Sequence, residues 1–409
     1  MESTEQARVA RRRVFYIPGY DPIHPRRYRE LYRKEGAAQA ALSGYRVALR
    51  PRSVTDGYGW VVEGRIENAE VLAEMEVLVW SDLVRGSMAS GILATYWQLL
   101  RTAWTYLGSG ALWRLMRLRK GPIIAALYPI FMLLAQLLLA LGLGAALAEG
   151  IGLVAPRWLG GGWLGVAAGL ALVPVVLRWF KARDGKLFAY YLMHDYAYSA
   201  RSGGANPSEL EARIASFRQK IAEALRGGYD EVLVVGHSSG AHLGVSILAD
   251  LIRAGGAPAS GPALSFLTLG QVVPMVSFLP RAERLRADLN YLAARDELTW
   301  IDVTAPGDGC AFALCDPVSV TGVAPAGKRW PLVISAAFTQ TLSPARWKEL
   351  RWRFFRLHFQ YLCAFDRPGD YDYFRITAGP LTLGARFKGR PPSKSRIERA
   401  VSRHTSMAA

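Results

Sequence analysis

Residues 231–254 read EVLVVGHSSGAHLGVSILADLIRA, and this stretch decides the fold. Glu231 to Val235 is a short apolar run typical of a buried strand, whereas Ala241 to Ala254 repeats its apolar residues at helical spacing. The five residues from Gly236 to Gly240 have the composition of a sharp turn. The stretch therefore predicts a strand, a turn and a helix, with Ser238 at the apex of the turn.

The turn Gly236-His237-Ser238-Ser239-Gly240 fits G-x-S-x-G, and the strand before it and the helix after it are the setting that a nucleophile elbow requires. Side chains at Gly236 or Gly240 would clash with the strand or the helix, so the glycines leave the Ser238 hydroxyl exposed above the sheet. On these residues the chain resembles the α/β-hydrolase superfamily of lipases, esterases and thioesterases, and in particular its bacterial membrane-bound members of unassigned substrate. The resemblance covers residues 13–24 and 205 to about 375.

Further apolar, β-rich runs lie on both sides of this stretch. They are Val14–Ile17, Trp60–Ile66, Val71–Trp80, Leu264–Leu269, Leu298–Thr304 and Pro331–Phe338. Helical patterns alternate with them, one in a basic stretch that ends near Tyr45 and one from Leu210 to Leu225. The alternation predicts an α/β fold with a mostly parallel sheet and helices on both faces, of the α/β-hydrolase type that the resemblance implies.

No charged residue occurs from Gly121 to Ala148 or from Trp158 to Leu177, and each of these apolar segments reaches the length of about 20 residues that a bilayer core requires. Basic residues gather outside them, at Arg114, Arg117, Arg119, Lys120, Arg178, Lys181, Arg183 and Lys186. The link from Glu149 to Arg157 carries one acid and one base. The positive-inside bias then predicts a multi-pass protein of the inner (cytoplasmic) membrane, with the catalytic domain and both termini in the cytoplasm. A pair of buried core helices is the alternative.

The membrane segments interrupt the hydrolase fold and divide the chain into five parts. Residues 1–86 and 181–385 are expected to form the N-terminal and C-terminal parts of the hydrolase domain, the latter with the catalytic triad. Residues 87–120 form an amphipathic juxtamembrane segment, residues 121–180 a two-helix transmembrane hairpin, and residues 386–409 a basic disordered tail that touches lipid.

The net charge is +17, but the basic residues that give it form no recognised nucleic-acid-binding motif. Attraction to anionic lipid headgroups accounts for these residues better. The three cysteines, Cys310, Cys315 and Cys363, form neither an even disulfide framework nor a zinc pattern, so we expect a reducing compartment and no metal. The N-terminus lacks the apolar run of a secretory signal. The expected partners are the lipid bilayer and a substrate, with no nucleic acid; the oligomeric state stays open.

A serine becomes a nucleophile when a base takes its proton, and that base is usually a histidine oriented by a carboxylate. The chain has histidines at positions 24, 194, 237, 242, 358 and 404. The order in the superfamily is serine, acid, histidine, so only His358 and His404 leave room for an acid after Ser238. Because His404 lies in the tail, His358 is the candidate base by elimination. A hydrogen-bonded core histidine is the alternative reading.

Asp308 is the candidate acid because it follows the predicted strand 298–304 and a Pro-Gly turn, where a carboxylate can face the histidine. Asp302, within that strand, and Asp316, further along the loop, are the alternative acids. Each of the three aspartates can also simply cap a turn.

The tetrahedral intermediate of acyl transfer needs hydrogen-bond donors for its oxyanion. The backbone N–H of Ser239 is one candidate by its position after the nucleophile. In the superfamily the second donor comes from the loop after an early strand, which here is the segment Pro18 to Pro22. Gly19 allows close approach there and Tyr20 offers its backbone N–H, although this loop departs from the H-G-G-G form of many lipases. An ordinary turn is the alternative.

These features predict a serine hydrolase that cleaves a carboxylic ester or thioester of a lipid or acyl compound through an acyl-enzyme on Ser238. No metal or organic cofactor is implied, because the triad supplies the nucleophile and the base. A peptidase or amidase with the same triad, a membrane scaffold without turnover and a nucleic-acid-binding membrane protein are the alternatives.

Overall fold

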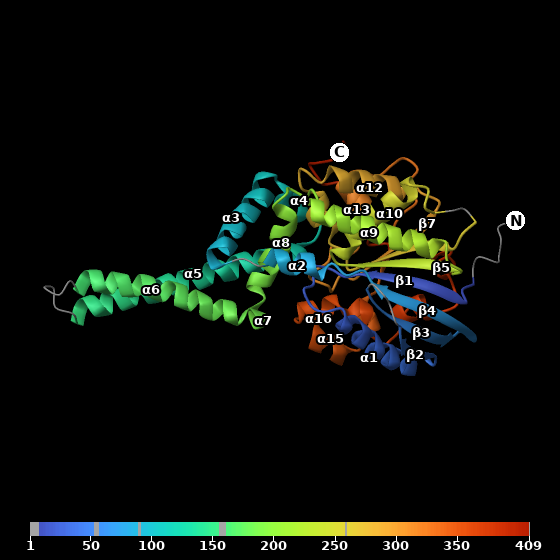
Figure 1. Ribbon diagram of the computed structural model, residues 1–409, viewed down its shortest axis with the longest axis horizontal. Helices are drawn as coiled ribbons and strands as arrows, with labels where there is room; N and C mark the ends of the chain where they lie inside the picture. Colours follow the sequence, from blue (N-terminus) through green and yellow to red (C-terminus); the bar gives the residue numbers. More distant parts are fainter. Residues whose placement is uncertain (1–7, 53–56, 89–90, 155–160, 258–259, 409) are drawn as a thin grey trace.

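The computed structural model describes residues 8–52, 57–88, 91–154, 161–257 and 260–408. An α/β body carries a long two-helix projection (Figure 1). The body contains an eight-stranded sheet in the order β2-β3-β4-β1-β5-β6-β7-β8. The strands are β1 (Arg11–Ile17), β2 (Arg46–Pro51), β3 (Tyr58–Ile66), β4 (Ala69–Val77), β5 (Glu231–His237), β6 (Ala263–Leu269), β7 (Leu298–Thr304) and β8 (Leu332–Ser335).

The sheet is mixed but mostly parallel. β1 pairs in parallel with β4 and β5, and β5 to β8 continue in parallel, whereas β3 runs antiparallel to β2 and β4. β3 and β4 are joined by a tight turn in which Glu67 and Asn68 both have positive φ, as in the hairpin turns that match strand twist. The α/β class and the mostly parallel sheet are thus confirmed. The edge strand β2 was not expected from the sequence.

Successive residues of the inner strands pack on opposite faces of the sheet. Val14 and Tyr16 of β1 join one buried cluster, whereas Phe15 and Ile17 join another. The first cluster includes α1 (Arg26–Ser43) and α17 (Tyr373–Ala378), and the second includes α9 (Ser208–Leu225), α10 (Gly240–Arg253) and α12 (Glu283–Ala293). Figure 1 shows α9, α10 and α12 above the sheet and α1 below it, so helices cover both faces.

Further helices complete the body and its junction with the projection. They are α2 (Ser81–Met88), α3 (Ile92–Gly108), α4 (Ala111–Leu115), α7 (Asp184–Leu187), α8 (Ala189–Ala200), α11 (Val273–Ser277), α13 (Pro317–Thr321), α14 (Phe338–Thr341), α15 (Pro344–Leu350), α16 (Phe354–His358), α18 (Leu383–Arg386) and the 3₁₀ turn η3 (Gln360–Leu362).

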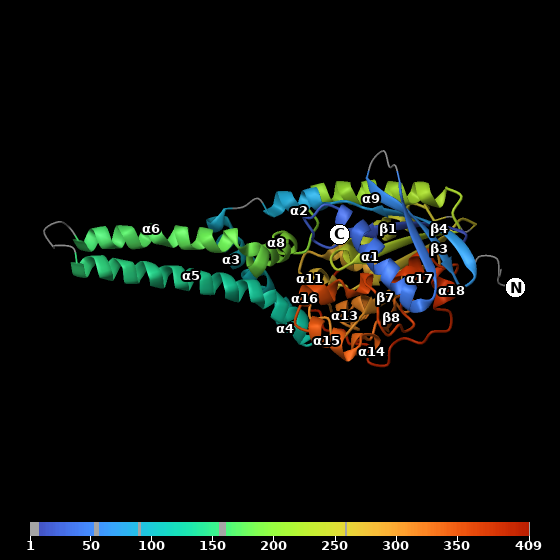
Figure 2. The same ribbon diagram turned by 90° about the horizontal axis from the view of Figure 1, so that it is seen from below.

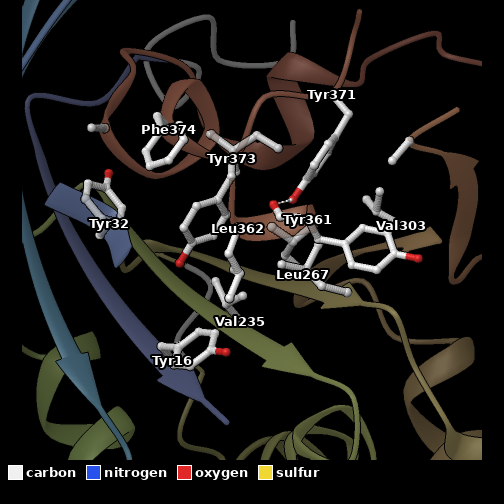
Figure 3. Packing of buried hydrophobic residues seen from close by; sticks show 14 of the residues in the cluster. Tyr16, Tyr32, Val235, Leu267, Val303, Tyr361, Leu362, Tyr371, Tyr373 and Phe374 are labelled. Atoms are coloured by element: carbon white, nitrogen blue, oxygen red, sulfur yellow. Dashed lines mark hydrogen bonds between the residues drawn. The ribbon is translucent and has the colours of Figure 1, made fainter. Parts of the chain in front are cut away.

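The first buried cluster is rich in aromatic rings (Figure 3). Tyr32 of α1 packs edge to face on Phe374 at a centroid distance of 5.0 Å, a geometry that favours aromatic pairs. Tyr371 donates a hydrogen bond to the Tyr361 carbonyl oxygen at 2.7 Å. This packing holds Tyr361 in place beneath the carboxyl ends of β5 to β7.

The projection consists of α5 (Lys120–Val154) and α6 (Gly161–Ala182), which coincide with the two uncharged segments. By length and composition both helices can span a membrane. Figures 1 and 2 show them extending side by side away from the body, and most of their apolar side chains are exposed. α5 continues through Glu149 to Val154, so this part of the expected link is helical. The rest of the link, residues 155–157, lies outside the described residues.

Glycines bring the two helices of the projection into backbone contact. A Cβ on Gly144 would lie 2.7 Å from the Gly169 carbonyl oxygen, and one on Gly169 would lie 2.3 Å from the Gly144 carbonyl oxygen. A Cβ on Gly165 would similarly lie 2.5 Å from the Ala148 carbonyl oxygen. Larger side chains at these positions would force the helices apart, so the small residues set their spacing.

The juxtamembrane segment 87–120 contains α3, an amphipathic helix. Thr95, Leu99 and Tyr106 are buried in the junction, whereas an apolar stripe faces outward. The exposed residues of the stripe are Leu93, Trp97, Leu100, Trp104 and Leu107. The amphipathic pattern is present, and the location of this helix at a membrane interface stays a prediction.

The prediction of a disordered tail over residues 386–409 is wrong for residues 386–408, which pack along the body. The Ile397 N–H donates to the Leu314 carbonyl oxygen at 2.7 Å, and the Val401 N–H donates to the Val320 carbonyl oxygen at 3.1 Å. The buried Arg286 guanidinium donates to the Ser406 carbonyl oxygen at 2.6 Å. Composition suggested disorder because the few apolar residues of the tail find their partners on distant segments.

We expect Gly169→Leu to loosen the projection, because its side chain would displace the Gly144 backbone and overpacking costs about 1–3 kcal/mol. The thermal unfolding midpoint of purified protein in detergent should fall. Gly142→Leu is the matched control, since no neighbouring segment among the described residues lies within 4 Å of a Cβ there. Equal midpoints for the two variants would contradict the packing described.

Candidate active site

Ser238 lies in a strained turn between β5 and α10. Its φ is 56°, a left-handed conformation that is uncommon for residues other than glycine. A Cβ on Gly236 would lie 2.7 Å from the Gly240 carbonyl oxygen, and one on Gly240 would lie 2.1 Å from the Ile17 carbonyl oxygen. The two glycines therefore permit a turn tight enough to hold Ser238 at its apex, half-exposed at the carboxyl end of a central strand.

The loop after β1 lies against this turn. A Cβ on Gly19 would lie 2.9 Å from Ser238 Cβ and 3.3 Å from Ser238 Oγ, so only glycine fits. Trp80 Nε1 donates to the Pro18 carbonyl oxygen at 3.0 Å, and the Tyr191 hydroxyl donates to the Tyr20 carbonyl oxygen. These bonds hold the backbone at Gly19 and Tyr20 beside the serine, where the sequence predicted a donor for the oxyanion. Ser239, the other predicted donor, is the residue before α10.

Asp308 and His358 form a buried pair near the serine. His358 Nδ1 donates to Asp308 Oδ2 at 2.7 Å. The same oxygen accepts from the Tyr361 hydroxyl at 3.0 Å, and Oδ1 accepts from the Cys310 N–H at 2.9 Å. This arrangement fixes the ring so that Nδ1 carries the proton and Nε2 is left to act as a base. His358 Nε2 is buried and has no hydrogen-bond partner among the residues that the structure describes.

Two backbone contacts link the serine turn to the imidazole. The Ser238 N–H donates to the Leu269 carbonyl oxygen at 2.9 Å, and a Cβ on the next residue, Gly270, would lie 3.0 Å from His358 Cε1. His237 Nε2 donates to the His358 carbonyl oxygen at 3.0 Å, and the two rings lie 4.8 Å apart. No hydrogen bond joins Ser238 Oγ to His358 Nε2 here. Such a bond commonly tightens only when substrate binds.

The environment keeps Asp308 ionised. Burial acts to raise its pKa, but the His358 imidazole and the hydrogen bonds from His358, Cys310 and Tyr361 outweigh burial and hold the pKa of Asp308 below its usual value. Burial lowers the pKa of His237 to about 3, so this ring stays neutral and donates to the carbonyl oxygen of His358. The pair therefore consists of a carboxylate that orients an imidazole.

The two alternative acids lie in other environments. Asp302 accepts from the Thr268 hydroxyl at 2.6 Å within the sheet, and burial raises the pKa of Asp302 to about 8. Asp316 caps α13 by accepting from the N–H groups of Val318 and Ser319, both at 3.0 Å, and pairs with Lys328 at 2.6 Å. Neither carboxyl group hydrogen-bonds His358, so the structure favours Asp308 among the three.

Sequence reasoning missed several residues of the site. Tyr361 braces Asp308, His237 braces the backbone of His358, and Asp195 of α8 lies within electrostatic reach of His358. Tyr361 and His237 adjoin residues that the motifs singled out, so proximity in sequence was an available signal. No local signal marks Asp195, because only the packing of α8 brings it to the site.

Asp308, Cys310 and His358 each offer a ligand atom, and these atoms lie within 4.8 Å of one another. Such a set can bind a soft divalent ion in principle. Burial raises the pKa of Cys310 well above its usual value, however, so its thiol stays protonated and is a poor ligand. The hydrogen bond between His358 and Asp308 also occupies two of the three groups. The arrangement suits an acid–base pair better than a metal centre.

No protein-family model, no curated protein and no solved structure matches the chain.

We expect Asp308→Asn and Asp302→Asn to differ sharply in ester hydrolysis. Asparagine at 308 would leave His358 without its carboxylate, and losing that group from a triad costs on the order of 10⁴-fold in kcat. Asparagine at 302 replaces a carboxyl group that is protonated below about pH 8, so this variant should retain most activity. Initial rates at neutral pH measure both. A larger loss in Asp302→Asn would make Asp302 the functional acid.

Proposed function

We propose that this protein is a membrane-anchored serine hydrolase of the α/β-hydrolase type, which cleaves a carboxylic ester or thioester of a lipid or acyl compound. The observation that carries the proposal is the oriented His358–Asp308 pair next to a serine held in a strained turn. A nucleophile, a base and a carboxylate that orients the base are the three groups that acyl transfer needs. Their order along the chain agrees with the superfamily that the sequence resembles.

In the proposed reaction, Ser238 Oγ attacks the carbonyl carbon while His358 Nε2 takes its proton. The oxyanion receives hydrogen bonds from the backbone N–H of Ser239 and from the loop at Gly19 and Tyr20. The imidazolium, stabilised by Asp308, then protonates the departing alcohol or thiol, and the acyl group remains on Ser238. Water, deprotonated by His358, releases the acid and restores the serine. No metal or organic cofactor enters this scheme.

The two-helix projection supports a substrate that resides at the membrane. Both of its ends adjoin the site: a Cβ on Gly121 of α5 would lie 3.1 Å from Gly309 Cα, beside Asp308, and Tyr191 of α8 bonds the loop at Tyr20. We place α5 and α6 across the inner membrane, with the body and both termini in the cytoplasm. The reason is that basic residues gather at the start of α5 and at the end of α6, where the two helices adjoin the body. The site then lies close to the cytoplasmic leaflet.

Labelling by a fluorophosphonate probe tests the proposed chemistry. Detergent-solubilised wild type should be labelled, and both Ser238→Ala and His358→Ala should lose labelling, because the first removes the nucleophile and the second its base. A screen of acyl esters, thioesters and amides against the labelled protein then separates an esterase from an amidase with the same triad. An unlabelled wild type would favour a scaffold without turnover.

The orientation can be tested separately by cysteine labelling in intact cells. Glu149→Cys, near the far end of α5, should react with a membrane-impermeant maleimide added outside the inner membrane. Asp296→Cys, on an exposed part of the body, should react only after the membrane is permeabilised. The reverse pattern would overturn the proposed orientation.

A further inference from the structure

α8 crosses the carboxyl-terminal side of the sheet and contacts two parts of the candidate active site. Its Tyr191 donates to the Tyr20 carbonyl oxygen, in the loop beside Ser238. The ring of Tyr191 also lies 6.0 Å from that of Phe355 in α16, the helix that carries His358. Tyr198, two turns further along α8, lies 5.8 Å from the Tyr20 ring. One face of α8 is therefore turned toward the site.

Asp195 lies on this face, one turn after Tyr191 and three residues before Tyr198. Its carboxyl group is within electrostatic reach of His358, of Cys310 in the acid loop and of Tyr20. The candidate site thus contains a second carboxyl group, which α8 contributes, whereas Asp308 lies on the loop after β7.

The Asp195 carboxyl group has no protein partner among the described residues. No hydrogen bond or ion pair there involves it, although its side chain is only partly exposed. Two cations that act on the neighbouring tyrosines are engaged elsewhere: Arg27, which influences Tyr191, pairs with Asp21 at 2.9 Å, and Arg201, which influences Tyr20, lies 5.3 Å over the Tyr198 ring. Withdrawing a carboxyl group from water without a partner is unfavourable, which is a reason to expect a ligand there.

Aromatic rings pack on the face of α8 that carries Asp195. Tyr20 lies 6.2 Å from Tyr191 and 6.1 Å from Trp80 between ring centroids, and Tyr198 completes the group. A carboxylate beside several aromatic faces is the combination that recognises ammonium groups, by charge and by cation–π attraction.

We propose that Asp195, with Tyr20 and Tyr191, forms a subsite for a positively charged ammonium group of the substrate, next to Ser238. The inference rests on the proposed hydrolase function and narrows its substrate class to acyl compounds with a cationic group in the part that leaves or in the acyl part near the ester. A zwitterionic lipid headgroup and a soluble amino-alcohol ester share this chemistry.

Paired substrates of equal shape test the subsite. Butyrylcholine carries a trimethylammonium group, and 3,3-dimethylbutyl butyrate is its uncharged isostere. For the wild type, kcat/KM should favour the cationic ester on the order of tenfold, and in Asp195→Asn this ratio should fall to about one. The ratio is the readout because both esters use the same triad. A long-chain acylcholine in phosphatidylglycerol vesicles, compared with butyrylcholine in solution, distinguishes a lipid source from a soluble one.

Asp296→Asn is the matched control, because it removes an acid that is exposed and paired with Arg329. Its ratio should equal that of the wild type. A wild type that is labelled by fluorophosphonate but shows no preference for the cation, or an unchanged ratio in Asp195→Asn, would overturn the subsite and leave the hydrolase intact. An unlabelled wild type that hydrolyses neither ester would overturn both proposals.

The preference for the cation should also depend on pH. Burial raises the pKa of Asp195 to about 7, so the ionised fraction grows as the pH rises through that value, and the ratio should increase from roughly pH 6 to 8. The titratable groups that influence or face Asp195 are His358, Cys310, Tyr20, Tyr106, Tyr191 and Tyr196. Asp195→Asn should give a flat profile, because both esters use the same triad and only the carboxyl group of Asp195 distinguishes them.

Discussion

The backbone of Ser238 has a φ of 56°, and much of the candidate site depends on this one strained residue. Such a conformation costs on the order of 1–3 kcal/mol and persists only where the surroundings determine it. Here β1, β5 and β6 converge on the turn, with Gly19, Gly236 and Gly240 in close backbone contact. Two buried clusters, one on each face of the sheet, stabilise these strands and offset the strain.

The projection is inserted between the two halves of the body, yet both of its ends return to the site. α5 begins beside the loop that carries Asp308, where Gly121 packs on Gly309, and α6 leads through α7 into α8, which contacts the loop at Tyr20. A displacement of the projection would therefore move the loop that carries Asp308 and the helix α8 together. This arrangement links the projection to the candidate site through packed backbone rather than through a flexible tether.

Burial and partners, not residue type, distinguish the carboxyl groups of the site. Asp308 is fully buried but ionised, because His358 and Tyr361 donate to it. Asp302, equally buried, has one hydroxyl donor and a pKa of about 8. Asp195 has no protein donor at all among the described residues, which is why we assign it to the substrate. Three aspartates of the same chemistry thus differ in role: Asp308 orients a histidine, Asp302 is structural, and Asp195 is proposed to recognise the substrate.

Local patterns predicted the elbow at Ser238, the projection, most of the strands, and Asp308 and His358 as partners, because each depends on the spacing of nearby residues or on their order along the chain. Tertiary structure alone decided which aspartate meets His358, how the tail after residue 386 packs, and that β2 forms the edge of the sheet. It also brought Asp195 to the site. These outcomes depend on contacts between segments far apart in the sequence, and periodicity and composition carry no information about such contacts.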